Sequence, residues 1–229
     1  MEKGFVIAID GPVAAGKGTV ASKLADDLQG FYLYTGGTYR SLALAAIEKG
    51  IELTNTEEII RLLSEVQIQF KDKQIFLNGK DVTDRIKEPD AANGSSVVAS
   101  LPEVRKQMVH VQRAAAEEKI NEGKIVVIEG RDTATVVFPN AALRVFLTAT
   151  DIVRAKRRLK QYLEQGDSRD FDHVLADVRE RDKRDTERAM DPLASNPEAL
   201  GYFILDDSEM DEAFTLNAIK SELKNRNLL

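Results

Sequence analysis

Four short stretches of the chain are almost wholly apolar and run directly into polar or charged residues. They are residues 4–9 (GFVIAI), 124–132 (KIVVIEGRD), 142–150 (ALRVFLTAT) and 202–207 (YFILDD). A strand that helices cover on both faces has no polar face, so it forms a continuous apolar run rather than an alternation. The pattern therefore predicts buried strands of a parallel sheet, each of which ends where polar side chains begin.

Between these stretches, apolar residues return every three or four positions, as they do on one face of a helix. In residues 19–29, for example, Val20, Leu24 and Leu28 have this spacing. The same spacing predicts helices over residues 41–49, 55–66, 101–123, 151–166, 171–190 and 210–225. Strands that alternate with helices predict an α/β fold, in which helices flank a parallel sheet and ligands bind at the carboxyl ends of the strands.

The period changes between residues 66 and 83. Three short alternating segments, VQIQF, KQIFLNG and KDVT, are separated by turn-forming residues that include Asn78 and Gly79. Alternation over a few residues, interrupted by such turns, is typical of antiparallel strands. We expect a small antiparallel sheet of two or three strands, inserted into the α/β scaffold.

Composition limits the class of protein. A chain of 229 residues, of which 43% are hydrophobic and 31% charged, is long enough for one substantial core but hardly for two large domains. It has no cysteine and two histidines, which excludes zinc–thiolate sites and leaves little for a metal cage. Any metal would be held by oxygen ligands or by the substrate.

Charge and hydropathy indicate a cytoplasmic protein. The net charge of -6 argues against a nucleic-acid coat protein. No apolar run approaches the roughly 20 residues that a membrane-spanning helix needs, and the first residues are unlike a secretion signal. We therefore expect neither a nucleic-acid partner nor a membrane partner.

The stretch DGPVAAGKGT, which follows the first predicted strand, is rich in glycine and leads into a helix. Such a loop aims several backbone N–H groups and the positive end of the helix dipole at one point, which suits phosphate. Gly11, Gly16 and Lys17 match the P-loop pattern of nucleotide-binding proteins, with Gly18 at the usual hydroxyl position and Thr19 after it. The strand and helix on either side favour a P-loop over an ordinary glycine-rich turn.

A P-loop alone does not distinguish GTPases, motor ATPases and kinases. The guanine-reading Asn-Lys-x-Asp run of signalling GTPases does not occur in the sequence. The stretch YTGGTYR, after the second strand candidate, offers a backbone turn, the hydroxyls of Thr35, Thr38 and Tyr39, and the guanidinium of Arg40. This stretch could bind a second anion that faces the P-loop. The alternative interpretation is an ordinary surface turn.

Charged residues are also clustered in the second half of the chain. Arg131 and Asp132 follow an apolar run and should lie at the ligand edge of the sheet, unless they merely pair with each other. Two predicted helices carry basic residues at intervals of three and four, which gathers them on one face unless that face is only solvated. They are Arg154, Arg157 and Arg158 on the first helix, and Arg181, Arg184 and Arg188 on the second, which also carries the carboxylate of Asp185 on that face.

Together these motifs resemble those of the bacterial cytidylate kinases, a branch of the nucleoside monophosphate (NMP) kinase family. The resemblance covers nearly the whole chain and depends on GPVAAGKGT, TGGTYR, GKDVTDRI, SSVVASLPEVRKQMVHVQR, GRDTATVVFPNA and RERDKRDTERAMDPL. It implies a three-layer P-loop kinase fold in a single domain over residues 1–229, with an NMP-binding region at 36–120 and a short lid at 153–172. It also implies a monomer.

The same resemblance implies phosphoryl transfer from ATP, with Mg²⁺, to CMP or dCMP in pyrimidine nucleotide metabolism. Its ATP-binding residues would be Gly11, Pro12, Val13, Ala14, Ala15, Gly16, Lys17, Gly18, Thr19 and Arg157, with Thr19 near the water shell of the metal. Its catalytic residues would be Lys17, Arg131, Arg154, Arg158 and Arg188, since cations stabilise the charge that is spread over the transferred group. Its acceptor-binding residues would be Thr35, Tyr39, Arg40, Ser96, Arg105, Arg131, Asp132, Arg181, Asp185 and Arg188.

Base choice has a physical basis in this assignment. Asp132, Arg105 and Ser96 correspond to the positions that contact the base in the family. Cytosine presents an amino donor and a ring acceptor, and uracil reverses both, so a buried carboxylate and guanidinium would be left unpaired by uracil. Two alternatives stay open, namely a related kinase with UMP as acceptor and a nucleotide-binding regulator without activity. Tyr34 stands where the family usually has an aspartate, and we expect His110 to pack or to face solvent.

Overall fold

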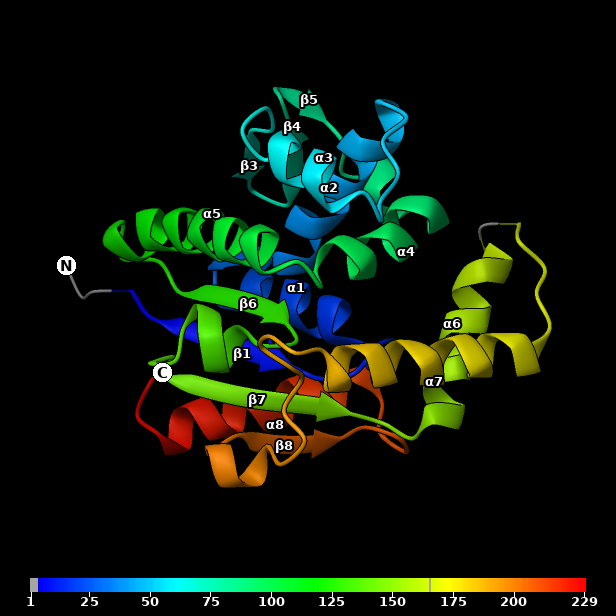
Figure 1. The fold of residues 1–229 in the computed structure, drawn as a ribbon. Coiled ribbons are helices and arrows are strands. Elements are labelled where there is room, and N and C mark those ends of the chain that lie inside the picture. Colours follow the sequence, from blue (N-terminus) through cyan, green and yellow to red (C-terminus); the bar gives the residue numbers. More distant parts are fainter. Residues whose placement is uncertain (1–3, 165) are drawn as a thin grey trace.

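A five-stranded parallel sheet forms the centre of the computed structural model, which describes residues 4–164 and 166–229 (Figure 1). In spatial order the strands are β2 (Phe31–Tyr34), β6 (Val126–Gly130), β1 (Val6–Asp10), β7 (Leu143–Thr148) and β8 (Phe203–Asp206). Each of the four apolar runs forms one of these strands, as predicted. Because all the strands are parallel, their carboxyl ends meet at one edge of the sheet.

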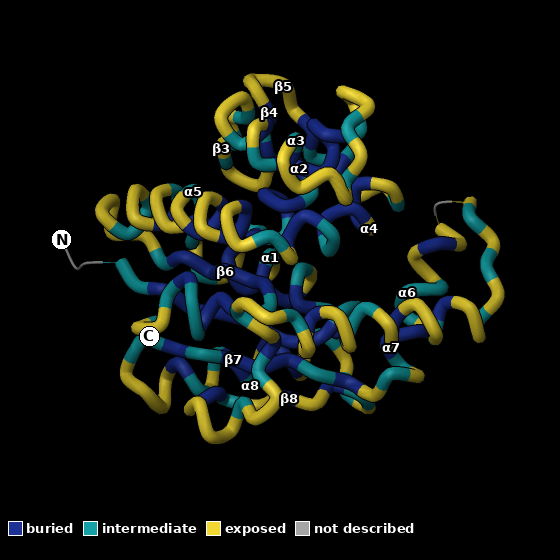
Figure 2. Tube along the Cα trace, viewed as in Figure 1, coloured by how far each residue is buried: buried dark blue, intermediate teal, exposed yellow. Residues whose placement is uncertain are grey.

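Helices cover both faces of the sheet, which confirms the predicted three-layer α/β fold. On one face, α1 (Lys17–Asp27) and α8 (Glu212–Asn225) pack against apolar side chains of β1, β6 and β7. On the other face lie α5 (Pro102–Asn121) and the short π-helix η2 (Thr133–Val137). All five residues of β1 and of β6 are buried, and Figure 2 shows these strands in the dark blue of buried residues.

A second core lies above the carboxyl edge of the sheet, in the upper part of Figure 1. Its helices are α2 (Thr35–Glu48), α3 (Thr56–Leu62), α4 (Pro89–Val98) and the first turns of α5, with the 3-10 turn η1 (Arg85–Lys87). They pack against an antiparallel sheet of β3 (Ile68–Lys71), β4 (Gln74–Leu77) and β5 (Lys80–Asp81). The predicted insertion is confirmed, with three strands.

Two further helices, α6 (Asp151–Glu164) and α7 (Phe171–Glu187), pack against each other around a small core of their own (Figure 1). The 3-10 turn η3 (Glu198–Leu200) precedes β8. Residue 165, which belongs to the predicted helix over 151–166 and to the predicted lid, lies outside the described residues. None of the described helices has both the length and the apolar character needed to cross a bilayer.

The backbone turn predicted at YTGGTYR is wrong, because Thr35 to Arg40 are the first residues of α2. Glycine lowers helix propensity, so the sequence favoured a turn. In the structure, a Cβ on Gly37 would lie 2.2 Å from Ile75 Cδ1, and one on Gly36 would lie 2.7 Å from the Tyr34 ring. The two glycines therefore serve close packing inside a helix rather than a turn.

Other boundaries also differ from the prediction. Helix α1 begins at Lys17 rather than at Thr19, and α3 ends at Leu62, before the predicted limit of 66. Helix α4 was not predicted at all. Its small and polar residues, including Asn93, Gly94 and Ser95, give no helical apolar period, yet the helix is held by packing against α2.

Candidate active site

The P-loop lies at the carboxyl end of β1 and turns sharply into α1. Gly11 cannot be replaced without a shift of β7, because a Cβ there would lie 2.0 Å from the carbonyl oxygen of Leu147. Ala14 and Gly16 have left-handed backbone conformations, with φ of 58° and 85°. Among the residues that the structure describes, no side chain caps the amino terminus of α1. The N–H groups of its first turn are therefore directed at the loop, as phosphate binding requires.

Lys17 is a buried cation at the start of α1. It is 5% exposed, and its Nζ donates a hydrogen bond to the carbonyl oxygen of Pro12 at 2.7 Å. Burial, helped by the nearby charge of Arg131, lowers the pKa of Lys17 to about 7. Within the described residues it forms no ion pair. An anionic ligand would therefore stabilise its charged form.

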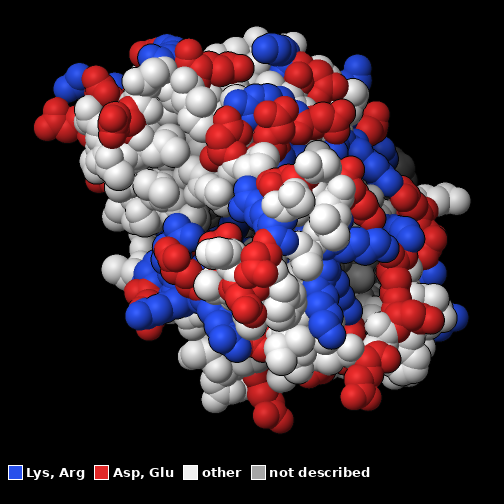
Figure 3. Space-filling view, turned by 90° about the vertical axis from the view of Figure 1, so that its right-hand side faces the viewer, with Lys and Arg blue, Asp and Glu red and all other residues white. Residues whose placement is uncertain are grey.

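A cavity of about 660 Å³ opens at the carboxyl edge of the sheet, between the P-loop, α2, α4 and α7. Most of the predicted site residues line it: Val13, Ala14, Ala15, Gly16, Lys17, Gly18, Thr19, Thr35, Tyr39, Arg40, Ser96, Arg105, Arg131, Asp132, Arg158, Arg181, Asp185 and Arg188. Four do not: Gly11, Pro12, Arg154 and Arg157. Figure 3 looks onto the α6–α7 side of the molecule, where Lys and Arg are interspersed with Asp and Glu on the outer surface.

Arg131, at the end of β6, is paired with α7 rather than with its neighbour in sequence. Its Nε donates to Asp185 at 2.6 Å. Burial alone would raise the pKa of Asp185, but the charges of Arg131 and Arg181 hold it below the usual value. The simple pair of Arg131 with Asp132, which was the alternative from sequence, is therefore not formed.

Asp132 lies between two other arginines. One carboxylate oxygen accepts from Nη2 of Arg105, and the other lies 3.4 Å from Nη2 of Arg188. Arg105 is 1% exposed, and its guanidinium lies over the ring of Tyr39, 5.6 Å from the ring centre. Burial raises the pKa of Asp132 in spite of the two arginines. The arrangement holds a carboxylate and a guanidinium side by side on the cavity wall.

Arg40 and Arg181, like Lys17, lie on the cavity wall and form no ion pair with a carboxylate within the described residues. Nη1 of Arg181 donates to the carbonyl of Ala92 at 3.3 Å, whereas its buried Nε has no partner in this part of the chain. Burial and the charge of Arg131 lower the pKa of Arg181 to about 10. Arg40 donates to the carbonyl of Ile86 at 3.0 Å and lies 5.6 Å from the ring centre of Tyr34. Such unpaired donors fit an anionic ligand with several oxygens.

The three arginines of α6 contact different partners. Arg154 donates to the carbonyl of Val13 at 3.0 Å and to Asp182 at 2.5 Å, while Arg157 donates to Asp207 at 2.9 Å. Arg158 lies over the ring of Tyr162, 4.4 Å from its centre. The partners of Arg154 and Arg157 come from three other segments, whereas Tyr162 belongs to α6 itself, so helical spacing alone could not place them all.

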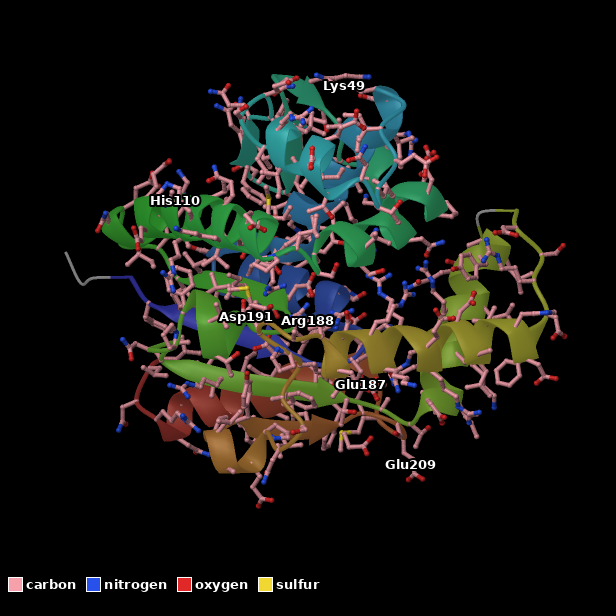
Figure 4. The ribbon with its side chains drawn as sticks, in the orientation of Figure 1. Lys49, His110, Glu187, Arg188, Asp191 and Glu209 are labelled. Atoms are coloured by element: carbon pink, nitrogen blue, oxygen red, sulfur yellow. The ribbon has the colours of Figure 1, made fainter. Side chains whose placement is uncertain are left out.

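Sequence reasoning missed the acidic residues that hold the site in place. Asp182 accepts from the backbone N–H of Val13 at 3.1 Å and so fixes the P-loop from α7. Asp10, which is fully buried, accepts from the backbone N–H groups of Thr133 and Ala134 and from the hydroxyl of Tyr202, each at 2.8 Å. The only sequence signal was the position of Asp10 directly before the P-loop. His110, by contrast, is exposed on α5, as expected (Figure 4).

The comparisons with known proteins agree with this geometry. The family model described as Cytidylate kinase matches residues 7–225. A protein of Polynucleobacter necessarius subsp. necessarius (strain STIR1), named cytidylate kinase, is 46% identical over 188 residues, which cover 82% of this chain and 85% of the relative. A cytidylate kinase of Pseudomonas putida (strain W619) is 41% identical over 230 residues, with 98% and 97% covered.

Among solved structures, an uncharacterized protein from Eubacterium ventriosum ATCC 27560 is similar with a TM-score of 0.55. It is 16% identical in sequence, and the match covers 97% of this chain and 99% of the other. At that identity, the likeness supports the fold alone.

Proposed function

The chain belongs to the cytidylate kinase family, and from this membership we propose that it transfers the terminal phosphoryl group of ATP to CMP and dCMP. One observation carries the proposal. A single cavity is lined both by Lys17 of the P-loop and by the Asp132–Arg105 pair, with Arg131 and Arg188 also on its wall. Such a cavity suits two phosphorylated ligands that meet within it.

The donor would be ATP with Mg²⁺. Residues 11–19 would hold its phosphates through the N–H groups at the start of α1 and through Lys17, whose lowered pKa the phosphates would raise again. No group of three or more acidic or histidine side chains that could hold a metal is present in the described residues. The ion would therefore be carried mainly on phosphate oxygens and water, close to the hydroxyl of Thr19, which lines the cavity.

The acceptor would occupy the part of the cavity that α2, α4 and α7 line. We propose that Arg40, Arg131 and Arg188 bind its phosphate, that Arg181 and Asp185 bind its sugar, and that Thr35 and Tyr39 line its site. The free Nε of Arg181 supports a ligand contact at that point. Asp132 would accept from the amino group of cytosine, with Arg105 and Ser96 as the further base contacts.

Transfer needs no general base, because charge stabilisation and alignment lower the barrier to phosphoryl transfer. Lys17, Arg131 and Arg188 would supply positive charge from the cavity wall. From the lid over 153–172, Arg158 would approach the transferred group, and Arg154 would act where it fixes the P-loop at Val13. Arg157 would approach the donor phosphates, since its Nη1 lies 3.8 Å from a Cβ built on Gly16. Closure of the lid and of the region 36–120 would exclude water.

An acceptor panel tests the proposal. CMP, dCMP, UMP and AMP are supplied in turn at fixed ATP and Mg²⁺, and the formation of ADP and of the diphosphate is followed by chromatography. We expect ADP to form only when an acceptor is added, with CMP and dCMP ahead of UMP. UMP turnover above CMP turnover would indicate the shifted-acceptor kinase, and no transfer to any acceptor would indicate a regulator. We propose further that the protein is a monomer and acts in the cytoplasm. Sedimentation of the purified chain tests its oligomeric state.

A further inference from the structure

Asp191 completes a closed ring of four charged residues behind the cavity wall. Its Oδ2 accepts from Nε of Arg105 at 2.8 Å, and its backbone carbonyl accepts from Nε of Arg188 at 2.7 Å. Asp132 closes the ring, because its two oxygens face the same two arginines. Figure 4 labels Arg188 and Asp191, which lie side by side just beyond α7. Asp191 itself does not line the cavity.

We propose that Asp191 is a positioning residue for base recognition, which holds Arg105 and Arg188 so that Asp132 and Arg105 present a matched acceptor and donor to cytosine. The inference rests on the proposed function and adds a residue that contacts no ligand. Asp191 lies in the stretch RERDKRDTERAMDPL, but the sequence pattern assigned it no role.

The first reason is the geometry of the guanidinium. Arginine carries its N–H groups in a rigid planar fork, so two carboxylates on different edges fix the plane of the whole group. Asp191 holds the Nε edge of Arg105 and Asp132 holds Nη2, while Nη1 makes a long contact of 3.4 Å with the carbonyl of Ala99. Without Asp191, one carboxylate would remain, and the plane would be free to turn about it.

The second reason is charge balance. The ring contains two guanidiniums and two carboxylates, all of which are at most about a fifth exposed. If the Asp191 carboxylate were removed, Asp132 would lie between two cations with no other acid in the ring. Both arginines would then compete more strongly for its oxygens, and Asp132 would accept less well from the amino group of a base.

The backbone of Asp191 allows a clean test. Its φ is 49°, a left-handed conformation that glycine adopts without strain. Asp191→Gly therefore removes the carboxylate from Arg105 while the carbonyl that accepts from Arg188 stays in place. Asp191→Asn keeps an acceptor oxygen for Arg105 but removes the charge. Gln29→Gly, at an exposed left-handed position with φ of 51° that does not line the cavity, is the matched control.

The experiment measures steady-state kinetics with CMP and with UMP, and the KM for ATP. We expect Asp191→Gly to raise the KM for CMP about tenfold, with kcat and the KM for ATP changed less than about twofold, since the charged hydrogen bond that orients Arg105 is lost. The preference for CMP over UMP should fall by a similar factor. Asp191→Asn should give a smaller effect, and Gln29→Gly none.

A double-mutant cycle with Arg105→Lys separates positioning from a merely structural role. Lysine has no Nε edge, so Asp191→Gly should add less than about a twofold rise in the KM for CMP in that background. The inference would be overturned if Asp191→Gly raised the KM for CMP equally in both backgrounds. It would also be overturned if the variant raised the KM for CMP and the KM for ATP equally. So would unchanged CMP kinetics of Asp191→Gly in an otherwise active protein. A wild-type chain that makes no CDP would instead overturn the proposed function, and this inference with it.

Discussion

Arg131 at the end of β6 donates its Nε to Asp185 of α7 at 2.6 Å, across 54 positions of the chain. Both side chains are largely buried, at 17% and 10% exposed. The contact ties α7 to the carboxyl edge of the sheet at the point where the cavity opens. It joins two motifs, GRD and RDKRD, that are far apart in the sequence.

Asp185→Asn should destabilise the protein in a pH-dependent way. Removal of one partner leaves the charge of Arg131 buried without its acid, which costs about 3 kcal/mol. The pKa of Asp185 is held below its ordinary value in the folded chain, so the stabilisation is fully present above the ordinary value of 3.8 and is lost as the pH falls through the lower folded value. Urea unfolding at a series of pH values measures the difference between wild type and variant.

We expect that difference to be largest near pH 7 and to shrink below about pH 4, where the wild-type carboxylate also begins to be protonated. Asp27→Asn, at an exposed position on α1 that pairs with Lys220 at 2.5 Å, is the control and should cost less than about 1 kcal/mol at any pH. A difference that grows toward acid pH would contradict the assignment.

Asp132→Asn should impair the use of CMP far more than the binding of ATP. An amide replaces one acceptor oxygen by a donor, so the amino group of cytosine would lose its charged acceptor, at a cost of roughly 1.5–3 kcal/mol or about 10- to 100-fold in affinity. Calorimetric titration of CMP without ATP, and of a non-hydrolysable ATP analogue without CMP, measures the two effects separately.

The same variant should narrow the preference for CMP over UMP, because its amide offers uracil a donor. Thermal unfolding checks that the variant is folded, since Asp132 also contacts Arg105 and Arg188. Equal losses of CMP and ATP affinity would show that Asp132 supports the fold rather than the base.

The parts of the fold that depend on local pattern could be predicted. A run such as KIVVIE is apolar because helices cover both faces of β6, and the glycines of the P-loop follow from the sharp turn out of β1. The start of α2 could not be predicted, because Gly37 packs closely against Ile75, a residue of the other sheet. The glycine at this helical position is therefore explained by packing between segments that are far apart in the sequence.

The site divides in the same way. Residues of the P-loop, the GRD segment and the α7 arginines were found because each motif is short and continuous. Asp10, Asp182 and Asp191 were not found, because the contacts that define them cross 192, 169 and 86 positions of chain. Most of the residues that were found line the cavity, whereas these three lie outside its lining and hold neighbouring residues in place.

Ala14→Gly should stabilise the protein slightly. Ala14 has φ of 58°, where a residue with a Cβ is strained by roughly 1–2 kcal/mol. Glycine relieves this strain, but it also raises the entropy of the unfolded chain, which offsets part of the stabilisation. We expect the free energy of unfolding to rise by about 0.5–1 kcal/mol in urea titrations. Ala114→Gly, on the exposed face of α5, is the control of opposite sign and should cost about 1 kcal/mol. A loss of stability in Ala14→Gly would show that the left-handed loop conformation is not strained.

Asp10→Asn and Tyr202→Phe should act on the same contact. Asp10 accepts from Tyr202 and from two backbone N–H groups of η2, and these bonds fix the turn that directly follows Asp132. Tyr202→Phe removes one donor but keeps the edge-on contact of the ring with Phe146, so it should cost about 1 kcal/mol.

Asp10→Asn places a donor against these donors and should cost about 3 kcal/mol, with a rise in the KM for CMP that exceeds the rise for ATP, because the turn also positions Asp132. Urea unfolding of both single variants and the double variant forms the cycle. The nitrogen of the asparagine amide cannot accept a hydrogen bond from the Tyr202 hydroxyl. Tyr202→Phe should therefore cost about 1 kcal/mol less in the Asp10→Asn background than in the wild type. Strictly additive costs would mean that Tyr202 and Asp10 stabilise the chain independently, and that the turn after β6 is held by its own residues.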